Sequence, residues 1–351
     1  MDRTRWTAPE AEADRIWHEP EVIIYNHSVY PGVSCSANAY DVANRKWYEL
    51  NVDSIVKDED WMENLITKYI SDYYSQHGSM PDFNVINTTC RGTPTTFEKK
   101  PNDHVARKIQ GNIHYGRGPA DIFPTTTFNQ IKQKYYLSRS SDRCIWHDTD
   151  CVFKRIEFVE DLDAIDREIR SREALAAALE PLDSTMDQKF HVLPILAVVN
   201  QHSETDEVLG IMLPYGGQSL ESLAGGYQYG MGAPSGVDPP PKPLPSLPIT
   251  EEQIQGLVRG IREMANAGVV HGDINDRNTL LTPDNRLVLI DLGEVAPDYI
   301  SDAYALGTMI LWAVEKVSWT KPDAEERARQ IGAYLQTETE NPFSRSVGPS
   351  F

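Results

Sequence analysis

The stretch His271-Gly272-Asp273-Ile274-Asn275-Asp276-Arg277-Asn278 and the shorter stretch Asp291-Leu292-Gly293 decide how the rest of this chain is interpreted. The first is a polar segment between apolar ones, and the second overlaps the end of RLVLID, which is typical of a short buried strand. A turn is expected between them at Pro283-Asp284-Asn285. The two stretches therefore place carboxylate and amide side chains on either side of a buried strand.

The spacing of these groups fits phosphoryl transfer from ATP. Asp273 stands five residues before Asn278, and Asp291 stands 13 residues after Asn278. One carboxylate can accept the proton of the attacking hydroxyl or orient it, while the Asn and the second Asp hold magnesium against the phosphates. Magnesium prefers oxygen ligands and keeps several waters, so few protein ligands are needed. We therefore expect Asp273 to be catalytic and Asn278 and Asp291 to bind the metal.

The segment HGDINDRN resembles the catalytic loop of the protein-kinase-like superfamily, and DLG resembles the metal-binding motif of that family. Matches to its other motifs follow in the family's order over about residues 130 to 318. Lys154 in CVFK matches the strand lysine, and Glu168 matches its helix partner, with Glu173 as second choice. Met212, Leu213 and Tyr215 match the hinge that meets adenine. Asp302 matches the start of the central C-lobe helix. The resemblance implies ATP and magnesium as cofactors, with the lysine, its partner and the hinge residues at the nucleotide.

The same resemblance implies an α+β fold that is bilobal and protein-kinase-like, with a truncated C-lobe and an N-terminal α+β extension. The expected parts are the extension at 1–130, an N-lobe and hinge at 131–223, a Gly/Pro-rich loop at 224–249, a truncated C-lobe at 250–335 and a tail at 336–351. Truncation is expected because only 36 residues follow Glu315.

Local patterns predict three helices in these parts. In the extension, WMENLITKYISDYYSQ at 61–76 fits an amphipathic helix that is followed by Gly78. Thr250 and Gln253 fit a capping box that begins a helix after the Gly/Pro-rich loop. The segment DAYALGTMILWAVEK, which starts at Asp302, is apolar nearly all round and is typical of a core helix.

Two departures from the family's pattern concern the groups that would handle phosphate. No glycine occurs in LSRSSDRCIWHDTDCVFK, where a phosphate loop should precede Lys154, and glycines let backbone N–H groups approach phosphates closely. The hydroxyls of Ser138, Ser140 and Ser141 stand there instead. Asn275 occupies the position of the usual lysine two residues after Asp273, so one positive charge is missing, although we expect Asn275 to act beside Asp273.

Two further departures concern the substrate. Gly272 replaces the arginine that reads a phosphorylated activation loop, and HGD is common in the small-molecule kinases of the superfamily. Asp291 and Asp302 are only 11 residues apart, which leaves no room for an ordinary activation segment. Both departures favour a small-molecule substrate over a peptide.

We therefore expect a cytoplasmic, ATP- and magnesium-dependent phosphotransferase that acts on a small molecule. Two alternatives stay open. The missing glycines, Asn275 and the short C-lobe also fit a pseudokinase that serves as a scaffold. A kinase fold reused in specialised metabolism is the other alternative, such as the fungal arginine-containing cyclodipeptide synthases, which use aminoacyl-tRNA; no motif in this chain singles out that group.

The composition limits the partners. The chain of 351 residues carries 33 basic and 52 acidic residues, a net charge of −19, which argues against broad nucleic-acid binding and restricts tRNA to a local basic patch. No apolar run is long enough for a membrane span, so no membrane partner is expected, and the N-terminus lacks the apolar region of a secretory signal.

Four cysteines without CxxC spacing indicate free thiols in a reducing cytoplasm. The segment PPPKPLPSLP at 239–248 favours polyproline II and is a candidate docking site.

Overall fold

The computed structural model describes residues 15–30, 34–56, 58–92, 95–100, 113–116, 118, 121–158, 160–179, 185–200, 206–225, 247–319 and 322–337. These residues contain seven α-helices together with β-sheets, so the mixed α+β class predicted from the sequence is confirmed. Most of the predicted Gly/Pro-rich loop, most of the Pro-rich docking segment and nearly all of the predicted tail lie outside the described residues. Within the described ranges, no helix combines the length and the apolar character needed to cross a membrane.

The chain divides into two compact units, each of which is built from two separate stretches of sequence. The first unit comprises Met1–Gly111 and Asn129–Asp148, and the second comprises Asn112–Phe128 and Thr149–Phe351. A single 3₁₀ turn, η2 (Phe128–Gln130), lies at one of the crossings between them. The domain boundaries predicted from the sequence remain a prediction.

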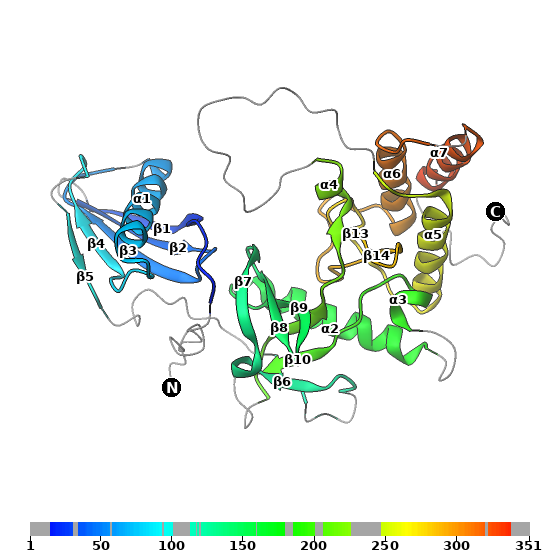
Figure 1. The fold of residues 1–351 in the computed structure, drawn as a ribbon, viewed down its shortest axis with the longest axis horizontal. Helices are drawn as coiled ribbons and strands as arrows, with labels where there is room; N and C mark the ends of the chain where they lie inside the picture. The colour runs from blue at the N-terminus through cyan, green and yellow to red at the C-terminus, as the bar shows by residue number, and fades with distance from the viewer. Residues whose placement is uncertain are drawn as a thin grey trace. The chain divides into compact units, whose positions relative to one another are not determined.

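A five-stranded sheet and one helix form the body of the first unit (Figure 1). The strands, in bonded order, are β1 (Val22–Tyr30), β2 (Ser34–Asp41), β3 (Lys46–Val52), β4 (Val85–Thr88) and β5 (Thr96–Glu98). Neighbouring strands are antiparallel except β3 and β4, which are parallel and are connected through α1 (Glu59–His77). A parallel pair needs such a crossover because a tight hairpin would reverse the second strand.

Helix α1 packs on the sheet because its apolar residues recur every fourth position. Met62, Ile66 and Ile70 are fully buried and share one cluster with side chains of the sheet such as Leu50. The helix ends at Gly78, whose φ of 66° lies in the left-handed region that glycine adopts without steric cost. The helix predicted over residues 61–76, followed by Gly78, is therefore confirmed.

The first unit also contains a hairpin formed by β7 (Lys132–Ser138) and β8 (Ser141–Trp146). Ser138 pairs with Ser141 across a turn that consists of Arg139 and Ser140. This is the segment where the family's order places a phosphate loop. The three serines considered as hydroxyl donors therefore lie in a tight hairpin turn and not in an extended loop.

Two arginines from the N-terminal part of the chain hold this hairpin. Arg45, in the turn between β2 and β3, binds the carboxylate of Asp142 at 3.1 Å, and the side chains of both residues are 0% exposed. Arg15 binds the same carboxylate through two N–H groups at 2.8 and 2.9 Å. Arg45 also donates to backbone carbonyl oxygens at the hairpin turn, those of Ser138 at 3.0 Å, Ser141 at 3.3 Å and Arg139. The negative charge of the buried Asp142 carboxylate is thus balanced by two guanidinium groups. Arg45 and Asp142 are 97 positions apart in the sequence.

The sheet of the second unit carries the first of the predicted site residues. Its strands, in bonded order, are β6 (Thr125–Thr127), β10 (Ala197–Asn200), β11 (Val208–Pro214) and β9 (Thr149–Arg155). Lys154 on β9 lies opposite Ile211 on β11 in this register. Helix α2 (Glu160–Ala177) follows β9 and contacts β11, and the short helix α3 (Met186–Lys189) precedes β10. Lys154 on β9 and Glu168 on α2 are thus carried by consecutive elements of the chain.

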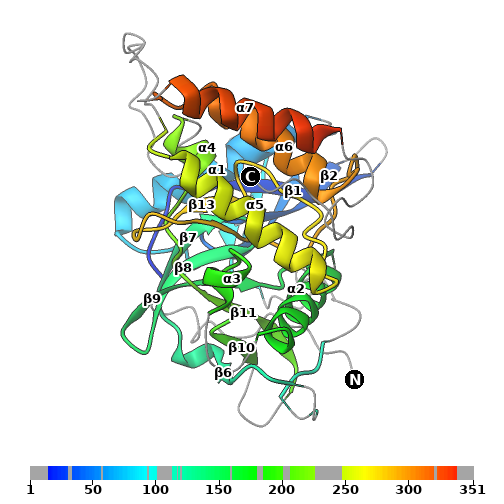
Figure 2. The same cartoon turned by 90° about the vertical axis from the view of Figure 1, so that its right-hand side faces the viewer.

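The rest of the second unit is a small sheet with helices packed beside it (Figure 2). The antiparallel strands β12 (Gln218–Ser219), β13 (Thr279–Leu281) and β14 (Leu287–Leu289) are bonded in this order, and α4 (Leu220–Leu223) follows β12. The helices are α5 (Glu251–Asn266), α6 (Asp302–Val314) and α7 (Pro322–Gln336).

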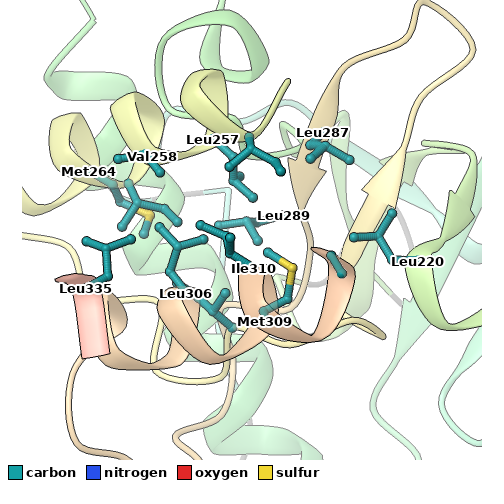
Figure 3. Close-up of a cluster of buried hydrophobic side chains, with 14 of the residues drawn as sticks. Leu220, Leu257, Val258, Met264, Leu287, Leu289, Leu306, Met309, Ile310 and Leu335 are labelled. Carbon is teal, nitrogen blue, oxygen red and sulfur yellow. The ribbon is translucent and has the colours of Figure 1, made fainter. Parts of the chain in front are cut away.

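Leucine, isoleucine, methionine and valine side chains from these helices and from β14 form one apolar core, of which Leu257, Met264, Leu289 and Leu306 are part (Figure 3). The capping box of Thr250 and Gln253 and the core helix from Asp302, both predicted, are confirmed.

Arg45→Met is expected to lower the free energy of unfolding by about 3 kcal/mol, because it removes a donor shared by the buried Asp142 and the backbone carbonyl groups of the hairpin turn. Urea denaturation followed by tryptophan fluorescence measures the change. Lys68→Met is the control, since it removes an ion pair with Asp72 in which the two side chains are 65% and 52% exposed, and such pairs contribute little. The role given to Arg45 is wrong if its variant unfolds at the same urea concentration as the wild type and the control.

Candidate functional site

Three predicted site residues meet in one cluster of charges. The Lys154 ammonium group donates to Glu168 Oε1 at 2.7 Å and to Asp291 Oδ1 at 2.6 Å. Lys154 comes from β9, Glu168 from the middle of α2, and Asp291 from the segment directly after β14. The structure therefore brings together residues that are 137 positions apart in the sequence.

Exposure differs sharply across this cluster. The Glu168 side chain is 0% exposed, whereas those of Lys154 and Asp291 are 17% and 33% exposed. Asp291 also has a φ of 64°, a left-handed conformation that few residues other than glycine adopt, so its carboxylate is held at this place by its surroundings. The cluster thus has a closed side at Glu168 and a side open to solvent at Lys154 and Asp291.

The charges determine the protonation of the buried pair. Burial alone would raise the pKa of Glu168, but Arg172 and Lys154 outweigh burial and lower this pKa to about 2. Burial would likewise lower the pKa of Lys154, but Glu168 and Asp291 outweigh it and raise this pKa above its ordinary value. Both groups are therefore charged at neutral pH.

A second set of predicted residues meets in the loop before β13. Asp273 Oδ1 accepts an N–H from Asn275 at 2.9 Å, and Asp273 Oδ2 accepts an N–H from Asn278 at 2.8 Å. Asn278 donates to the Asp273 carbonyl as well, at 2.9 Å, and Asn275 Oδ1 accepts the Asn278 backbone N–H at 2.9 Å. Two amide groups thus fix the direction of the Asp273 carboxylate, and each of its oxygens keeps a further lone pair.

The backbone of this loop is fixed by a buried carboxylate on α6. Asp302 accepts the backbone N–H groups of His271 at 2.8 Å and Gly272 at 2.9 Å. His271 Nε2 donates to the Ile290 carbonyl at 2.9 Å, so Nδ1 accepts the Asp273 backbone N–H at 3.2 Å. Burial lowers the pKa of His271, which keeps the ring neutral. The histidine therefore holds the loop with both ring nitrogens.

Gly272 has a backbone conformation that favours glycine. Its φ is 92°, and a Cβ at this position would lie 2.9 Å from the Glu294 carbonyl oxygen. The Ala296 N–H donates to the Gly272 carbonyl at 3.0 Å, so the segment after Asp291 runs close beside the loop. An arginine here, as in protein kinases, would clash with this segment.

Asn278 directly precedes β13, and Asp291 follows β14, which pairs with β13. The Ile290 N–H donates to the Asn278 carbonyl at 2.9 Å, and β13 and β14 continue the pairing. Asn278 binds Asp273 through Nδ2, which leaves its amide oxygen turned away from Asp273. One carboxylate and one amide oxygen are a donor set that suits magnesium, which keeps waters in its remaining positions. In the described part of the chain, no group of three or more His, Cys, Asp or Glu side chains is arranged to hold a metal.

The predicted hinge residues are positioned by the pairing of β11. Met212 lies opposite Phe153, the neighbour of Lys154 along β9, and Leu213 lies opposite Val152. Met212 and Leu213 are buried, and the Tyr215 N–H donates to the Asp150 carbonyl at 3.1 Å. Glu173, the second choice for the partner of Lys154, instead accepts from Tyr115 at 2.9 Å and from Arg170 at 2.8 Å.

Two arginines on α2 belong to the site although the motifs did not indicate them. Arg172 contacts the second carboxylate oxygen of Glu168. Arg167 donates to three carbonyl groups around the loop, those of Val270, His271 and Glu294, at 3.0, 3.2 and 2.5 Å. The one sequence signal for Arg172 is its position four residues after Glu168, which places both on the same face of a helix.

The chain matches no protein-family model and no curated protein.

Glu168→Gln is expected to reduce stability at neutral pH, and the difference from the wild type should shrink as the pH falls toward 2.5. A carboxyl group whose pKa is about 2 in the folded state, against an ordinary value of 4.5, stabilises the fold above pH 4.5 and loses that contribution as the pH falls toward 2. Urea denaturation between pH 7 and pH 2.5 measures the difference. A difference that stays constant over this range would contradict the charged, paired state assigned to Glu168.

Proposed function

We propose that this chain is a cytoplasmic, ATP- and magnesium-dependent phosphotransferase with a bilobal, kinase-like arrangement, and that its substrate is a hydroxyl group of a small molecule. The observation that carries the proposal is the contact of Lys154 with both Glu168 and Asp291. The order of the elements supports it, because strand β9, helix α2, strand β11, the Asp273 loop and the Asp291 segment follow one another as in the family that the sequence resembles.

Lys154 is suited to bind a phosphate oxygen. An ammonium group has three N–H donors, and Glu168 and Asp291 use two of them. Its partly exposed position lets the third N–H meet a phosphate from the solvent side. Asn278 and Asp291 would hold magnesium, which neutralises the charge that develops on the transferred phosphoryl group.

Asp273 is suited to receive the proton of the attacking hydroxyl. Its two oxygens are oriented by Asn275 and Asn278 and retain lone pairs for a further hydrogen bond. Asn275 itself brings no positive charge, and Arg277 is paired with Glu221 at 3.0 Å. Orientation of the hydroxyl and charge stabilisation by Lys154 and the metal would therefore supply most of the rate.

The short segment between Asp291 and Asp302 supports a small substrate. Its backbone is tied to the catalytic loop through Ala296 and Gly272, and Asp302 already begins α6. No part of it forms a helix or strand on which a peptide would be laid out. In the described part of the chain, no disulfide joins Cys35, Cys90, Cys144 and Cys151, which fits a reducing compartment.

ATP should bind to the purified protein only in the presence of magnesium, and Asp291→Ala should weaken this binding by at least about tenfold, or about 1.4 kcal/mol. The reason is that Asp291 both ligates the metal and contacts Lys154. Isothermal titration calorimetry with and without magnesium measures the affinity. Asp284→Ala, in the turn between β13 and β14, is the control and should bind as the wild type does. If the wild type does not bind at millimolar ATP, the phosphotransferase proposal is wrong.

Asp273→Asn should lower the rate of phosphoryl transfer by roughly 10²- to 10⁴-fold while ATP still binds, because only the proton acceptor is lost. Phosphate transfer from labelled ATP to a panel of small hydroxyl compounds provides the assay. Asp276→Asn is the matched control, three residues further along the same loop. ATP binding without turnover on any compound would favour the pseudokinase, and turnover that survives Asp273→Asn would remove Asp273 from the mechanism.

A further inference from the structure

Arg172 is a fully buried cation, and among the described residues its one ion pair is with Glu168 of the site. Its side chain and that of Glu168 are both 0% exposed, and an N–H of its guanidinium contacts Glu168 Oε2. Its Nε–H donates to the Leu193 carbonyl at 2.7 Å, in the segment before β10. The two oxygens of Glu168 are therefore divided, one to Lys154 and one to Arg172.

Stability alone does not explain a cation at this position. The Arg172 Nη2 group is buried and has no hydrogen-bond partner among the described residues. An unpaired buried donor is costly, and an apolar side chain of similar volume often replaces a buried ion pair without loss of stability. Neighbours on the same helix, Ile169 and Leu175, are apolar and equally buried.

From this geometry we infer that Arg172 is a positioning residue of the site, which fixes the Glu168 carboxylate so that Lys154 is presented to phosphate before any nucleotide binds. The anchor is the backbone at Leu193, because Arg172 reaches that carbonyl and the carboxylate at the same time. Glu168 and Arg172 lie on the same helix, so a turn of α2 that moved Glu168 away from Lys154 would also pull the Arg172 Nε–H away from the Leu193 carbonyl. The inference rests on the proposed function, since the position of Lys154 matters there for phosphate binding.

The charge balance supports this role. Lys154 and Arg172 carry two positive charges, and Glu168 and Asp291 carry two negative charges, so the cluster is neutral without a ligand. A bound phosphate competes with Asp291 on the open side of the cluster. Because Arg172 holds Glu168 on the closed side, the contact between Lys154 and Glu168 would persist when Lys154 turns toward phosphate.

The test compares Arg172→Met, Glu168→Gln and the double variant in the absence of nucleotide. The measured quantity is the rate at which cyanate carbamylates Lys154, and peptide mass spectrometry detects the modified lysine. Cyanate reacts with the unprotonated amine, so a fall of one unit in the pKa of Lys154 speeds labelling about tenfold. If Arg172 positions Glu168, Arg172→Met frees the carboxylate from Lys154, and labelling rises about tenfold, as it does in Glu168→Gln. The double variant should then show no further increase.

The opposite result is equally clear. If Arg172 contributes only charge, its removal leaves Lys154 paired with Glu168, and labelling in Arg172→Met stays equal to the wild type or becomes slower. That outcome, or labelling increases that multiply in the double variant, would overturn the inference. Arg286→Met, which removes ion pairs with Asp187 and Asp284 elsewhere in the second unit, is the control and should label as the wild type does.

A second readout separates this inference from the proposed function. Arg172→Met and Glu168→Gln should each weaken MgATP binding about tenfold in calorimetry, with no further loss in the double variant, and Arg172→Lys should restore part of the affinity. Circular dichroism melts select a temperature at which every variant is folded, and Arg172→Lys replaces Arg172→Met if the latter does not fold. A wild type that fails to bind ATP refutes the proposed function, while the labelling result still decides the role of Arg172.

Discussion

The polar interior of the second unit depends on a single carboxylate that lies between two cations. Glu168 is completely buried, and a charge in that environment is tolerable only because Lys154 and Arg172 share it. Through these contacts the carboxylate connects β9, α2, the segment before β10 and, by way of Lys154, the segment after β14. Apolar packing could join the same elements, but it would not fix the direction of a lysine to within a hydrogen bond.

A second buried carboxylate, that of Asp302, positions the loop from His271 to Asn278 as Glu168 positions Lys154. Asp302 lies at the start of a helix whose other residues are mostly apolar. Its two carboxylate oxygens accept the backbone N–H groups of His271 and Gly272. The loop is thereby attached to the core of the unit. The position of the loop backbone in turn determines where the side chains of Asp273 and Asn278 point. The two halves of the candidate site are thus each held by one buried acid, and the backbone of Ile290, the neighbour of Asp291, connects them through Asn278 and His271.

Sequence reasoning succeeded where the determining residues are close together along the chain. The capping box of Thr250 and Gln253 and the helix that Gly78 ends both depend on spacings that can be counted. The hydrogen bond between Asp273 and Asn278 also joins residues that are close in sequence, while the roles given to Asp273, Asn278 and Asp291 stay predictions. Sequence reasoning was less informative where the interacting residue is distant along the chain. Nothing near Asp142 indicates that Arg45, 97 positions earlier, holds it. The segment around Asp142, where the resemblance placed a phosphate loop, is a hairpin. Arg172 was missed because its role depends on a carbonyl group that no side-chain motif records.

The way in which the chain passes between the two units affects how the protein is made. The chain leaves the first unit after residue 111, returns at residue 129 and leaves again after residue 148. On the ribosome, Arg15 and Arg45 emerge long before the carboxylate that receives them, so both guanidinium groups stay in water while the five-stranded sheet and α1 are already complete. Domains generally fold from the N-terminus as they are synthesised. Here the first unit cannot close until a piece of the second has been translated, and neither unit corresponds to one uninterrupted segment of the gene.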